Sequence, residues 1–456
     1  MVKHTEFINK KILVLGAGIS GISVAYILRQ LGAEVTLSDA KSADHFTNDF
    51  TQLLSAGVVL SLGNQSEELL ADMNYLVLSP GISIYIPLVA KARERGITVM
   101  SEVEVAYRLS DAPVVAITGT NGKTTTTTLV GEILRTTGRK VAVGGNIGAA
   151  LSEQALVADT DGFLVAEISS FQLEGVIQFR PRIAAILNIT PDHLDRHRTM
   201  QIYQQMKEQV FVNQQAGDYL ILNYDDSIVR EMAARAPGKV VYFSRQQALE
   251  SGIYVEEETI RLKWEGKIID ICKVSDIKIK GGHNVENALA ACAVGYFAGA
   301  KPEKMADVLK SFPGVEHRIE PVAELAGVPY FNDSKATNPE SSIKALEAFP
   351  GHIILIAGGR DKNTDLTDFM KLAKEQVDHL ILLGEAQLRF AEAAAARGIT
   401  AIHKVNSFQE AVMLAHRLAK PPQVVLLSPA CASYDMFNNY EERGRTFKEL
   451  VHRLVP

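Results

Sequence analysis

The segment that most constrains the fold is a glycine loop set between an apolar stretch and a threonine-rich stretch. The pattern predicts a strand at Val114 to Thr118, a loop at Gly119 to Gly122, and a helix that starts with the threonine run. Glycines let backbone N–H groups close on phosphate oxygens, while the helix presents its positive end to the same anion. Lys123 can neutralise outer phosphates, and Thr124 supplies a hydroxyl where P-loop proteins ligate Mg²⁺. The segment therefore predicts a nucleotide site in a parallel α/β domain.

The loop departs from the standard P-loop pattern in one place, because Ile117 stands where that pattern has its first glycine. The alternative is an ordinary glycine turn with a surface lysine. The coincidence of strand, loop, Gly-Lys-Thr and helix favours a phosphate-binding loop. The residues expected to contact ATP in it are Gly119, Thr120, Asn121, Gly122, Lys123, Thr124 and Thr125.

A second glycine motif lies near the start of the chain. The predicted strand Ile12 to Leu15 precedes Gly16, Gly18 and Gly21, which form G-x-G-x-x-G, and a second strand ends at Asp39. Dinucleotide-binding folds place an acid for a ribose hydroxyl at that position. Alone, the motif suggests NAD or FAD, so a nicotinamide-dependent oxidoreductase is one alternative reading.

The chain of 456 residues is about three times a typical domain of ~150 residues. Strands in the later part of the chain are predicted at 162–166, 183–187, 219–222, 353–357, 379–383 and 424–428, a helix at 200–214, and a small antiparallel excursion at 253–279. The fold class is therefore α/β with three domains: an N-terminal Rossmann-like parallel sheet in 1–101, a central P-loop-type ATPase domain in 102–314, and a C-terminal Rossmann-like domain in 315–456.

Composition narrows the classes of function. Hydrophobic residues make up 47% of the chain and charged residues 22%, which is the profile of a soluble globular protein. The formal net charge of -6 argues against a protein that binds a nucleic-acid backbone. The three cysteines form no C-x-x-C pair, so a reducing cytosol is expected. We find neither a signal segment nor an apolar stretch approaching the ~20 residues of a membrane span. A cytoplasmic protein without membrane partners is predicted.

Longer motifs carry a resemblance to a known family. The loop GTNGKTT is followed in order by GGNIG at 144–148, EISSFQLE at 167–174, NITPDHLDRH at 188–197 and NDSKATNPES at 332–341. This series resembles the Mur ligase family. The segment LSPACASYDMFNNYEERG at 427–444 is similar to the member that adds D-glutamate. Folylpolyglutamate synthetases share the ATP loop but would not need a separate N-terminal Rossmann-like unit.

The resemblance implies an ATP-dependent ligase of peptidoglycan precursor synthesis. Its reaction would join D-glutamate to UDP-N-acetylmuramoyl-L-alanine through an acyl phosphate, and the chain would act as a monomer. Both steps bring anions together, so clamping by Mg²⁺ and lysine is expected to be the main catalytic device. The remaining alternative is a nucleotide-binding regulator without catalysis, which the metal and amino-acid motifs disfavour.

The same resemblance assigns the catalytic and metal-binding residues. Lys123, His193 and Lys207 are the catalytic candidates. Thr124 and Glu167 would serve the Mg²⁺ at the ATP phosphates, and His193 a second Mg²⁺ nearer the substrate carboxylate. Lys207 matches the family's lysine that CO₂ converts to a carbamate, which gives the metal oxygen ligands that an ammonium cannot. The plain alternatives are a structural histidine and a solvated lysine.

Further nucleotide contacts are also assigned by resemblance. Asn284 and Asn287 would meet the adenine end, although asparagine is also a preferred helix cap, so capping by Asn284 is an alternative. Arg318 and Asp333 would approach the nucleotide, and Lys335 the phosphates once the third domain swings inward.

Substrate contacts are the last set. Ser20, Asp39, Ser79 and Gly81 are candidates for the uridine diphosphate, and Asn146 of GGNIG for the same substrate. The candidates for D-glutamate are Thr337, Lys362, Ser433 and Tyr440, a cation plus hydroxyl or backbone donors for two carboxylates. Whether Arg360 or Lys362 faces the amino acid stays open.

Overall fold

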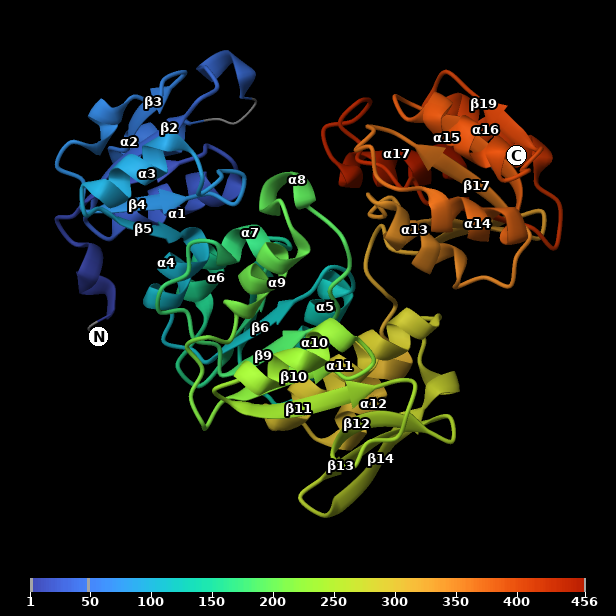
Figure 1. Cartoon of the computed structure of the whole chain (residues 1–456), viewed down its shortest axis with the longest axis horizontal. Coiled ribbons are helices and arrows are strands. Elements are labelled where there is room, and N and C mark those ends of the chain that lie inside the picture. Colours follow the sequence, from blue (N-terminus) through green and yellow to red (C-terminus); the bar gives the residue numbers. More distant parts are fainter. Residues whose placement is uncertain (1–2, 47–49, 455–456) are drawn as a thin grey trace. The chain divides into compact units, whose positions relative to one another are not determined.

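The computed structural model describes residues 3–46 and 50–454 and contains three β-sheets with helices packed around them (Figure 1). The chain divides into two compact units. The first runs to Ile277 and includes 285–311, and the second comprises 278–284 and the chain from Phe312 onward. The first unit holds two of the sheets and the second unit the third. The boundaries at 101 and 314 stay predictions.

The first sheet is parallel and five-stranded, in the order β3-β2-β1-β4-β5. Its strands are β1 (Lys11–Leu15), β2 (Glu34–Asp39), β3 (Val59–Leu62), β4 (Tyr75–Leu78) and β5 (Thr98–Ser101), and its helices are α1 (Ile19–Gln30), α2 (Thr51–Ala56) and α3 (Pro87–Glu94). The strand order reverses between β1 and β4, and ligands of such sheets bind beyond the carboxyl ends of the strands at that point. The predicted Rossmann-like sheet is confirmed.

The second sheet has nine strands in the order β14-β13-β12-β11-β10-β9-β6-β8-β7. These are β6 (Val114–Thr118), β7 (Val141–Gly145), β8 (Phe163–Glu167), β9 (Ile183–Ile186), β10 (Tyr219–Asn223), β11 (Lys239–Ser244), β12 (Gly252–Glu256), β13 (Thr259–Trp264) and β14 (Lys267–Lys273). Only β12, β13 and β14 pair antiparallel within it, so the predicted antiparallel excursion is confirmed. Strand β6 lies between β9 and β8, and its five residues are all buried.

Helices cover this sheet and place the motifs. They are α4 (Glu102–Leu109), α5 (Lys123–Arg135), α6 (Leu151–Val157), α7 (Ser170–Leu173), α8 (Leu194–His197), α9 (Met200–Glu208), α10 (Ser227–Glu231), α11 (Gly282–Phe297) and α12 (Pro302–Ser311). Thr199 caps α9 by accepting from the Ile202 N–H at 3.2 Å. The helix predicted over 200–214 is too long, because α9 ends at Glu208 and turn residues follow at 209–213. Gln214 lies beyond these turns, and its side-chain amide donates to the carbonyls of Pro181 and Tyr219.

The third sheet has six strands in the order β15-β16-β20-β17-β18-β19. Its elements are β15 (Glu320–Leu325), β16 (Val328–Asn332), α13 (Pro339–Leu346), β17 (Ile353–Gly358), α14 (Thr367–Gln376), β18 (Val377–Leu383), α15 (Gln387–Ala396), β19 (Ile402–Lys404), α16 (Phe408–Leu418), β20 (Val424–Leu427) and α17 (Tyr440–His452). Strand β15 is antiparallel to β16, and the other pairs are parallel.

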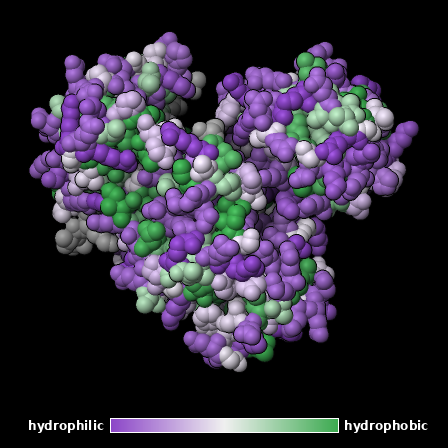
Figure 2. Space-filling view, in the orientation of Figure 1, coloured by the Kyte–Doolittle hydropathy of each residue, from purple (hydrophilic) through white to green (hydrophobic). Residues whose placement is uncertain are grey.

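The face shown in Figure 2 is mostly hydrophilic, with apolar residues scattered over it. Within 3–46 and 50–454, no helix combines the length and apolar character that crossing a bilayer requires.

Candidate active site

The central glycine loop is held open by backbone conformations that favour glycine and by bonds to the chain after β9. Gly119 has φ 147° and Gly122 has φ 83°. The Thr120 N–H donates to the Asn188 carbonyl at 3.0 Å, and the Asn121 N–H to Asn188 Oδ1 at 2.8 Å. The loop geometry thus depends on a segment almost seventy residues further along the chain.

Two lysines meet at this loop. Lys123 Nζ donates to the carbonyls of Gly119 at 2.9 Å and Thr120 at 2.7 Å, while Lys207 Nζ donates to the same Gly119 carbonyl at 2.7 Å. Lys207 is 1% exposed. Burial, and after it the charge of Lys123, hold the pKa of the Lys207 ammonium well below its usual value. A lowered pKa favours the neutral amine, which is the form able to react as a nucleophile.

Glu167 lies on the strand next to the loop. In the register of β6 and β8 it pairs with Ile117, two residues before Gly119. Its Oε1 accepts from Asn146 Nδ2 at 2.9 Å, so the sequence motifs GGNIG and EISSFQLE meet here. Its Oε2 is buried and has no hydrogen-bond partner among the described residues. A buried carboxylate oxygen left free in this way fits a metal ligand.

Thr124 belongs to the same region. It is the second residue of α5 and is buried, and its carbonyl accepts from Thr128 Oγ1 at 2.8 Å inside the helix. A hydroxyl and a carboxylate from neighbouring β6–α5 and β8 are the hard oxygen donors that Mg²⁺ prefers.

His193 directly precedes α8 in a left-handed backbone conformation with φ 54°. Its ring lies 4.7 Å from that of Phe171 and 6.4 Å from that of Tyr203, and its Nε2 is 3.5 Å from Asp192 Oδ2. The side chain is 39% exposed. The structure therefore orients the imidazole by ring contacts while leaving part of it accessible.

The N-terminal glycine loop is braced by two of the predicted substrate residues. Asp39 accepts from the Ala17 N–H at 2.8 Å and the Lys41 N–H at 2.9 Å, and Ser79 Oγ donates to the Gly16 carbonyl at 2.8 Å. Ser20 is half-buried at the first turn of α1, and Gly81 is exposed. The sequence motif indicated ligand contacts here, and it did not reveal this bracing.

The two asparagines of α11 have different partners. Helix α11 starts at Gly282, so Asn284 lies inside its first turn, where Nδ2 donates to the Lys280 carbonyl at 2.7 Å. The capping alternative for Asn284 is therefore wrong. Asn287 Oδ1 accepts from Thr126 Oγ1 at 3.2 Å, and a Cβ on Gly122 would lie only 2.3 Å from it. Asn287 thus lies against the central glycine loop.

Among the predicted site residues of the second unit, Asp333 has a large shift in pKa. Its carboxylate accepts from Ser428 Oγ at 2.8 Å and from the Ile319 N–H at 3.2 Å. Burial raises the pKa of Asp333 to about 7, against the opposing effect of the Arg318 charge. Lys335 Nζ lies 5.3 Å from the centre of the Tyr440 ring.

The residues predicted to bind D-glutamate differ in solvent exposure. Ser433 is buried, Thr337 is half-buried, and Lys362 and Arg360 are exposed. Arg360 lies 3.6 Å from Glu385. Neither position decides which cation would meet the amino acid.

Arg443 is a residue of this unit that sequence reasoning missed. It is 1% exposed and donates to Ser334 Oγ and to the carbonyls of Ser334, Cys431 and Ala432. It therefore joins the NDSKATN segment to the ACAS segment. Its presence inside the quoted motif NNYEERG was the only signal in the sequence.

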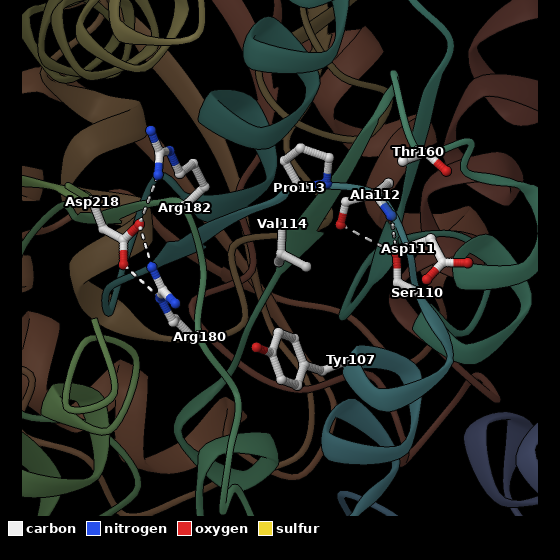
Figure 3. A pocket seen from close by; sticks show the side chains of 10 residues that line it. All are labelled: Tyr107, Ser110, Asp111, Ala112, Pro113, Val114, Thr160, Arg180, Arg182 and Asp218. Atoms are coloured by element: carbon white, nitrogen blue, oxygen red, sulfur yellow. Dashed lines mark hydrogen bonds and ion pairs between the residues drawn. The ribbon is translucent and has the colours of Figure 1, made fainter. Parts of the chain in front are cut away.

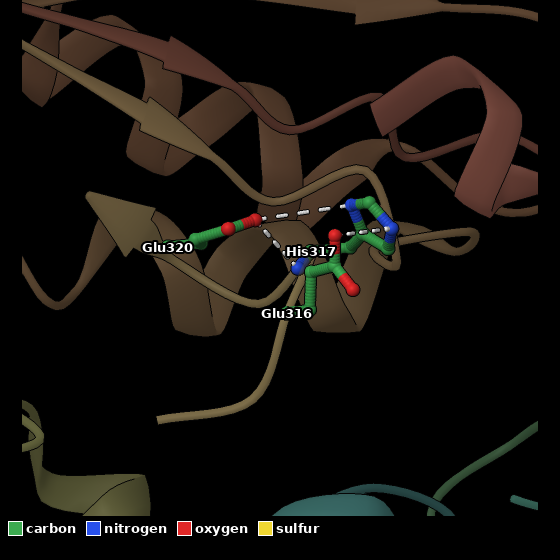
Figure 4. A group of neighbouring side chains, drawn as sticks. All are labelled: Glu316, His317 and Glu320. Carbon is green, nitrogen blue, oxygen red and sulfur yellow. Dashed lines mark hydrogen bonds and ion pairs between the residues drawn. The ribbon is translucent and has the colours of Figure 1, made fainter. Parts of the chain in front are cut away.

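Glu316, His317 and Glu320 form a tight group of metal-type ligands (Figure 4). The two ring nitrogens of His317 face different carboxylates, with Nε2 3.7 Å from Glu316 and Nδ1 3.8 Å from Glu320. Lys448 Nζ donates to both carboxylates. Because Lys448 already pairs with both acids, we interpret the group as an ion-pair network.

A hollow of 290 Å³ opens at the amino ends of β6, β9 and β10, where Arg180 and Arg182 point at Asp218 (Figure 3). Arg180 Nε donates to Asp218 Oδ2 at 2.7 Å. The glycine loop lies at the opposite, carboxyl end of β6, where ligands of parallel sheets bind. We therefore assign this hollow no part in the chemistry.

The fold and the loop define a three-domain α/β enzyme of the ATP-using ligase class, and comparison with known proteins makes the class specific. The chain belongs to the Mur ligase family. Residues 10–101 match the Mur ligase MurD-like N-terminal domain, 117–295 the Mur ligase middle domain, and 317–431 the Mur ligase glutamate ligase domain. The resemblance inferred from the motifs and the three-domain α/β fold class are confirmed.

Two relatives show how far the likeness extends. The UDP-N-acetylmuramoylalanine–D-glutamate ligase of Caldanaerobacter subterraneus subsp. tengcongensis is 47% identical over 448 residues, which cover 98% of this chain and 99% of the relative. The ligase of the same name from Pelotomaculum thermopropionicum is 45% identical over 446 residues, covering 98% of each. Neither the oxidoreductase nor the folylpolyglutamate synthetase alternative fits these relatives.

Solved structures agree on the fold alone. The UDP-N-acetylmuramate-alanine ligase MurC of Thermotoga maritima has a TM-score of 0.60 at 18% identity, covering 97% of this chain and 99% of that one. MurF of Acinetobacter baumannii has a TM-score of 0.61 at 18% identity, covering 98% and 92%.

Proposed function

We propose that this chain joins D-glutamate to UDP-N-acetylmuramoyl-L-alanine at the expense of ATP, through an acyl phosphate, in peptidoglycan precursor synthesis. The main support for the proposal is the 45–47% identity to D-glutamate ligases over 98% of this chain. The position of Lys123 at the glycine loop supports it, because phosphoryl transfer to a carboxylate needs a cation placed where anions meet.

Lys123 is proposed to release its loop carbonyls and neutralise the phosphates of bound ATP. The loop N–H groups and the start of α5 would hold the same phosphates. Thr124 and Glu167 would hold a Mg²⁺, and His193 a second ion. Bound there, Mg²⁺ supplies positive charge to the oxygens that gain negative charge during transfer.

Lys207 is proposed to carry a carboxyl group on its amine. Addition of CO₂ to the neutral amine forms one N–C bond and releases one proton, leaving an anionic carbamate. The lowered pKa that burial produces increases the share of the neutral amine, which is the form that reacts with CO₂. The carbamate would accept where the ammonium donates, so its oxygens could serve the metal, and the cationic neighbour Lys123 would become an attractive partner.

The other contacts remain those implied by the family. Ser20, Asp39, Ser79 and Gly81 would bind the uridine diphosphate, and Asn146 the rest of that substrate. Asn284, Asn287, Arg318, Asp333 and Lys335 would complete the ATP site, and Thr337, Lys362, Ser433 and Tyr440 would bind D-glutamate. We propose domains at 1–101, 102–314 and 315–456, and a cytoplasmic monomer.

Phosphate release from ATP tests the function directly. The purified chain is supplied with UDP-N-acetylmuramoyl-L-alanine and, separately, D-glutamate, L-glutamate, L-alanine or a diamino acid. Release with D-glutamate alone is expected. Release with another acceptor would assign the chain to a different ligation step, and release with none would leave a binding role.

A further inference from the structure

Arg196 joins the two domains of the first unit at the candidate site. Its side chain is 12% exposed, and its Nε donates to Glu174 Oε1 at 3.0 Å. Its Nη2 pairs with the other oxygen of Glu174, which is itself 1% exposed. This is a fork-to-fork pair of the kind that fixes geometry as well as charge.

The far side of the same guanidinium reaches the N-terminal domain. Nη1 donates to the Pro80 carbonyl at 2.8 Å, and Nη2 donates to the Ile82 carbonyl at 2.7 Å. These carbonyls flank Gly81. Ser79, which precedes Pro80, donates from its hydroxyl to the Gly16 carbonyl of the N-terminal glycine loop. Arg196 therefore bonds the Ser79–Ile82 turn from one side, and the glycine loop contacts that turn from the other.

A single aromatic ring links Arg196 to His193. The Arg196 Cζ lies 4.1 Å from the centre of the Phe171 ring, and the His193 ring lies 4.7 Å from the same ring. His193 and Arg196 are also three residues apart, at the start and inside α8. Phe171 thus packs against both side chains, so the guanidinium that holds the turn lies close to the histidine.

We propose that Arg196 is a positioning residue that fixes the Ser79–Ile82 turn of the N-terminal domain against α8, and so holds the uridine-diphosphate end of the substrate in register with the reacting end. The inference rests on the proposed function. It assigns Arg196 no contact with substrate, and it predicts an effect on one of the three substrates only.

The chemistry of the four acceptors explains why an arginine is needed. Two carboxylate oxygens and two carbonyls surround the group, and a planar guanidinium can donate to all of them at once. A lysine keeps the charge beside buried Glu174 but is a point donor. Arg196→Lys should therefore preserve the fold and loosen the turn, whereas Arg196→Ala would leave a buried carboxylate unpaired.

The test measures the KM of each substrate, and the affinity of UDP alone by calorimetry, for wild type and Arg196→Lys. We expect the KM of UDP-N-acetylmuramoyl-L-alanine and the Kd of UDP to rise about tenfold, because a turn displaced by an ångström loses its contacts. The KM values of ATP and D-glutamate should stay within about twofold.

Arg180→Lys is the matched control. Arg180 also pairs with a buried carboxylate, Asp218, but does so at the amino end of the sheet (Figure 3). It should change none of the three KM values. The double variant Arg196→Gln with Glu174→Gln removes both charges together, so it leaves no buried charge unpaired and should show the same selective rise.

Unchanged UDP affinity in both Arg196 variants would overturn the proposal, and so would an equal rise in all three KM values. A fall in kcat with every KM unchanged would also overturn it, since it would place Arg196 in the chemical step. If wild type binds UDP but does not turn over, the proposed function fails, and the UDP affinities still decide the role of Arg196.

Discussion

The two glycine loops of the first unit follow the same local plan and are built from different partners. Each follows a buried parallel strand and starts a helix, at Gly18 in one and Gly122 in the other. The first loop is braced by the Asp39 carboxylate and the Ser79 hydroxyl, and its Ile19 is 74% exposed. The second is buried and receives the two lysine amines.

The side chains around the two loops differ in a way that distinguishes a site that only binds a nucleotide from one that also reacts with it. Both loops present backbone N–H groups at a helix start, which suffices to bind a phosphate. Only in the second do amines, a buried carboxylate and a hydroxyl gather at the carboxyl ends of neighbouring strands. The chemistry therefore comes from the side chains placed around the loop, which the glycine pattern alone does not specify.

Loss of Lys123 from the second loop should have the largest effect on activity. Lys123→Ala would leave a glycine loop that binds but does not transfer, so turnover should fall about 10³-fold or more. Phosphate release measures the rate, and circular dichroism confirms the fold. Lys11→Ala, at an exposed ion pair with Asp72 at the amino end of β1, should have no such effect. A near-normal rate in Lys123→Ala would refute the phosphate-clamp role.

Lys207→Ala should be the next most severe change, with turnover lower by about 10²-fold because the carbamate ligand is lost. A small carboxylate such as acetate can occupy the vacated space, so partial rescue is expected. Lys207→Arg leaves no such space and should not be rescued. Full activity of the alanine variant without acetate would rule out the carbamate.

A methyl group placed on each loop should change stability by different amounts. Gly122→Ala brings a Cβ within 2.3 Å of Asn287 Oδ1 at φ 83°, so it should lower the free energy of unfolding by about 1–3 kcal/mol. Gly18→Ala meets nothing within 4 Å at φ -80°, and should change that energy by less than about 0.5 kcal/mol. Urea unfolding measures both. Similar losses in the two variants would contradict the difference in packing.

Asp39→Asn should have a smaller effect than Gly122→Ala. An amide can accept only one of the two N–H bonds from Ala17 and Lys41, so we expect a loss of about 1 kcal/mol in stability. The KM of the uridine substrate should rise a few-fold, and the KM of ATP should not change. An effect on ATP would mean that the two loops are not independent.

The local pattern of the sequence predicted what depends on neighbours in the chain. Strand β6, the start of α5 at the threonine run and the antiparallel strands after Gly252 were all recognisable because their periodicity and glycines lie within a few residues. The strands that were missed are β3, β5, β7, β11, β15, β16 and β19. Strand β15 alternates poorly, with most of its residues half-buried at a sheet edge, and β19 has only three residues.

The contacts that make the site could not be read in the same way. Lys207 reaches a carbonyl 88 residues earlier, and Arg196 reaches carbonyls more than a hundred residues earlier. Such pairings depend on strand order and on how helices cover the sheet. The family resemblance named Lys207 but gave no reason for its reactivity, whereas burial beside Lys123 supplies a physical one.

The antiparallel strands of the nine-stranded sheet bear on how the protein behaves at high concentration. Among the described residues, β14 has a neighbouring strand on one side only. Its exposed positions include Lys267, Asp270 and Lys273. A second molecule that added a strand at this edge would have to place its own side chains beside these charges, which is unfavourable. The three antiparallel strands β12, β13 and β14 therefore protect this edge of a mostly parallel sheet against aggregation with another molecule.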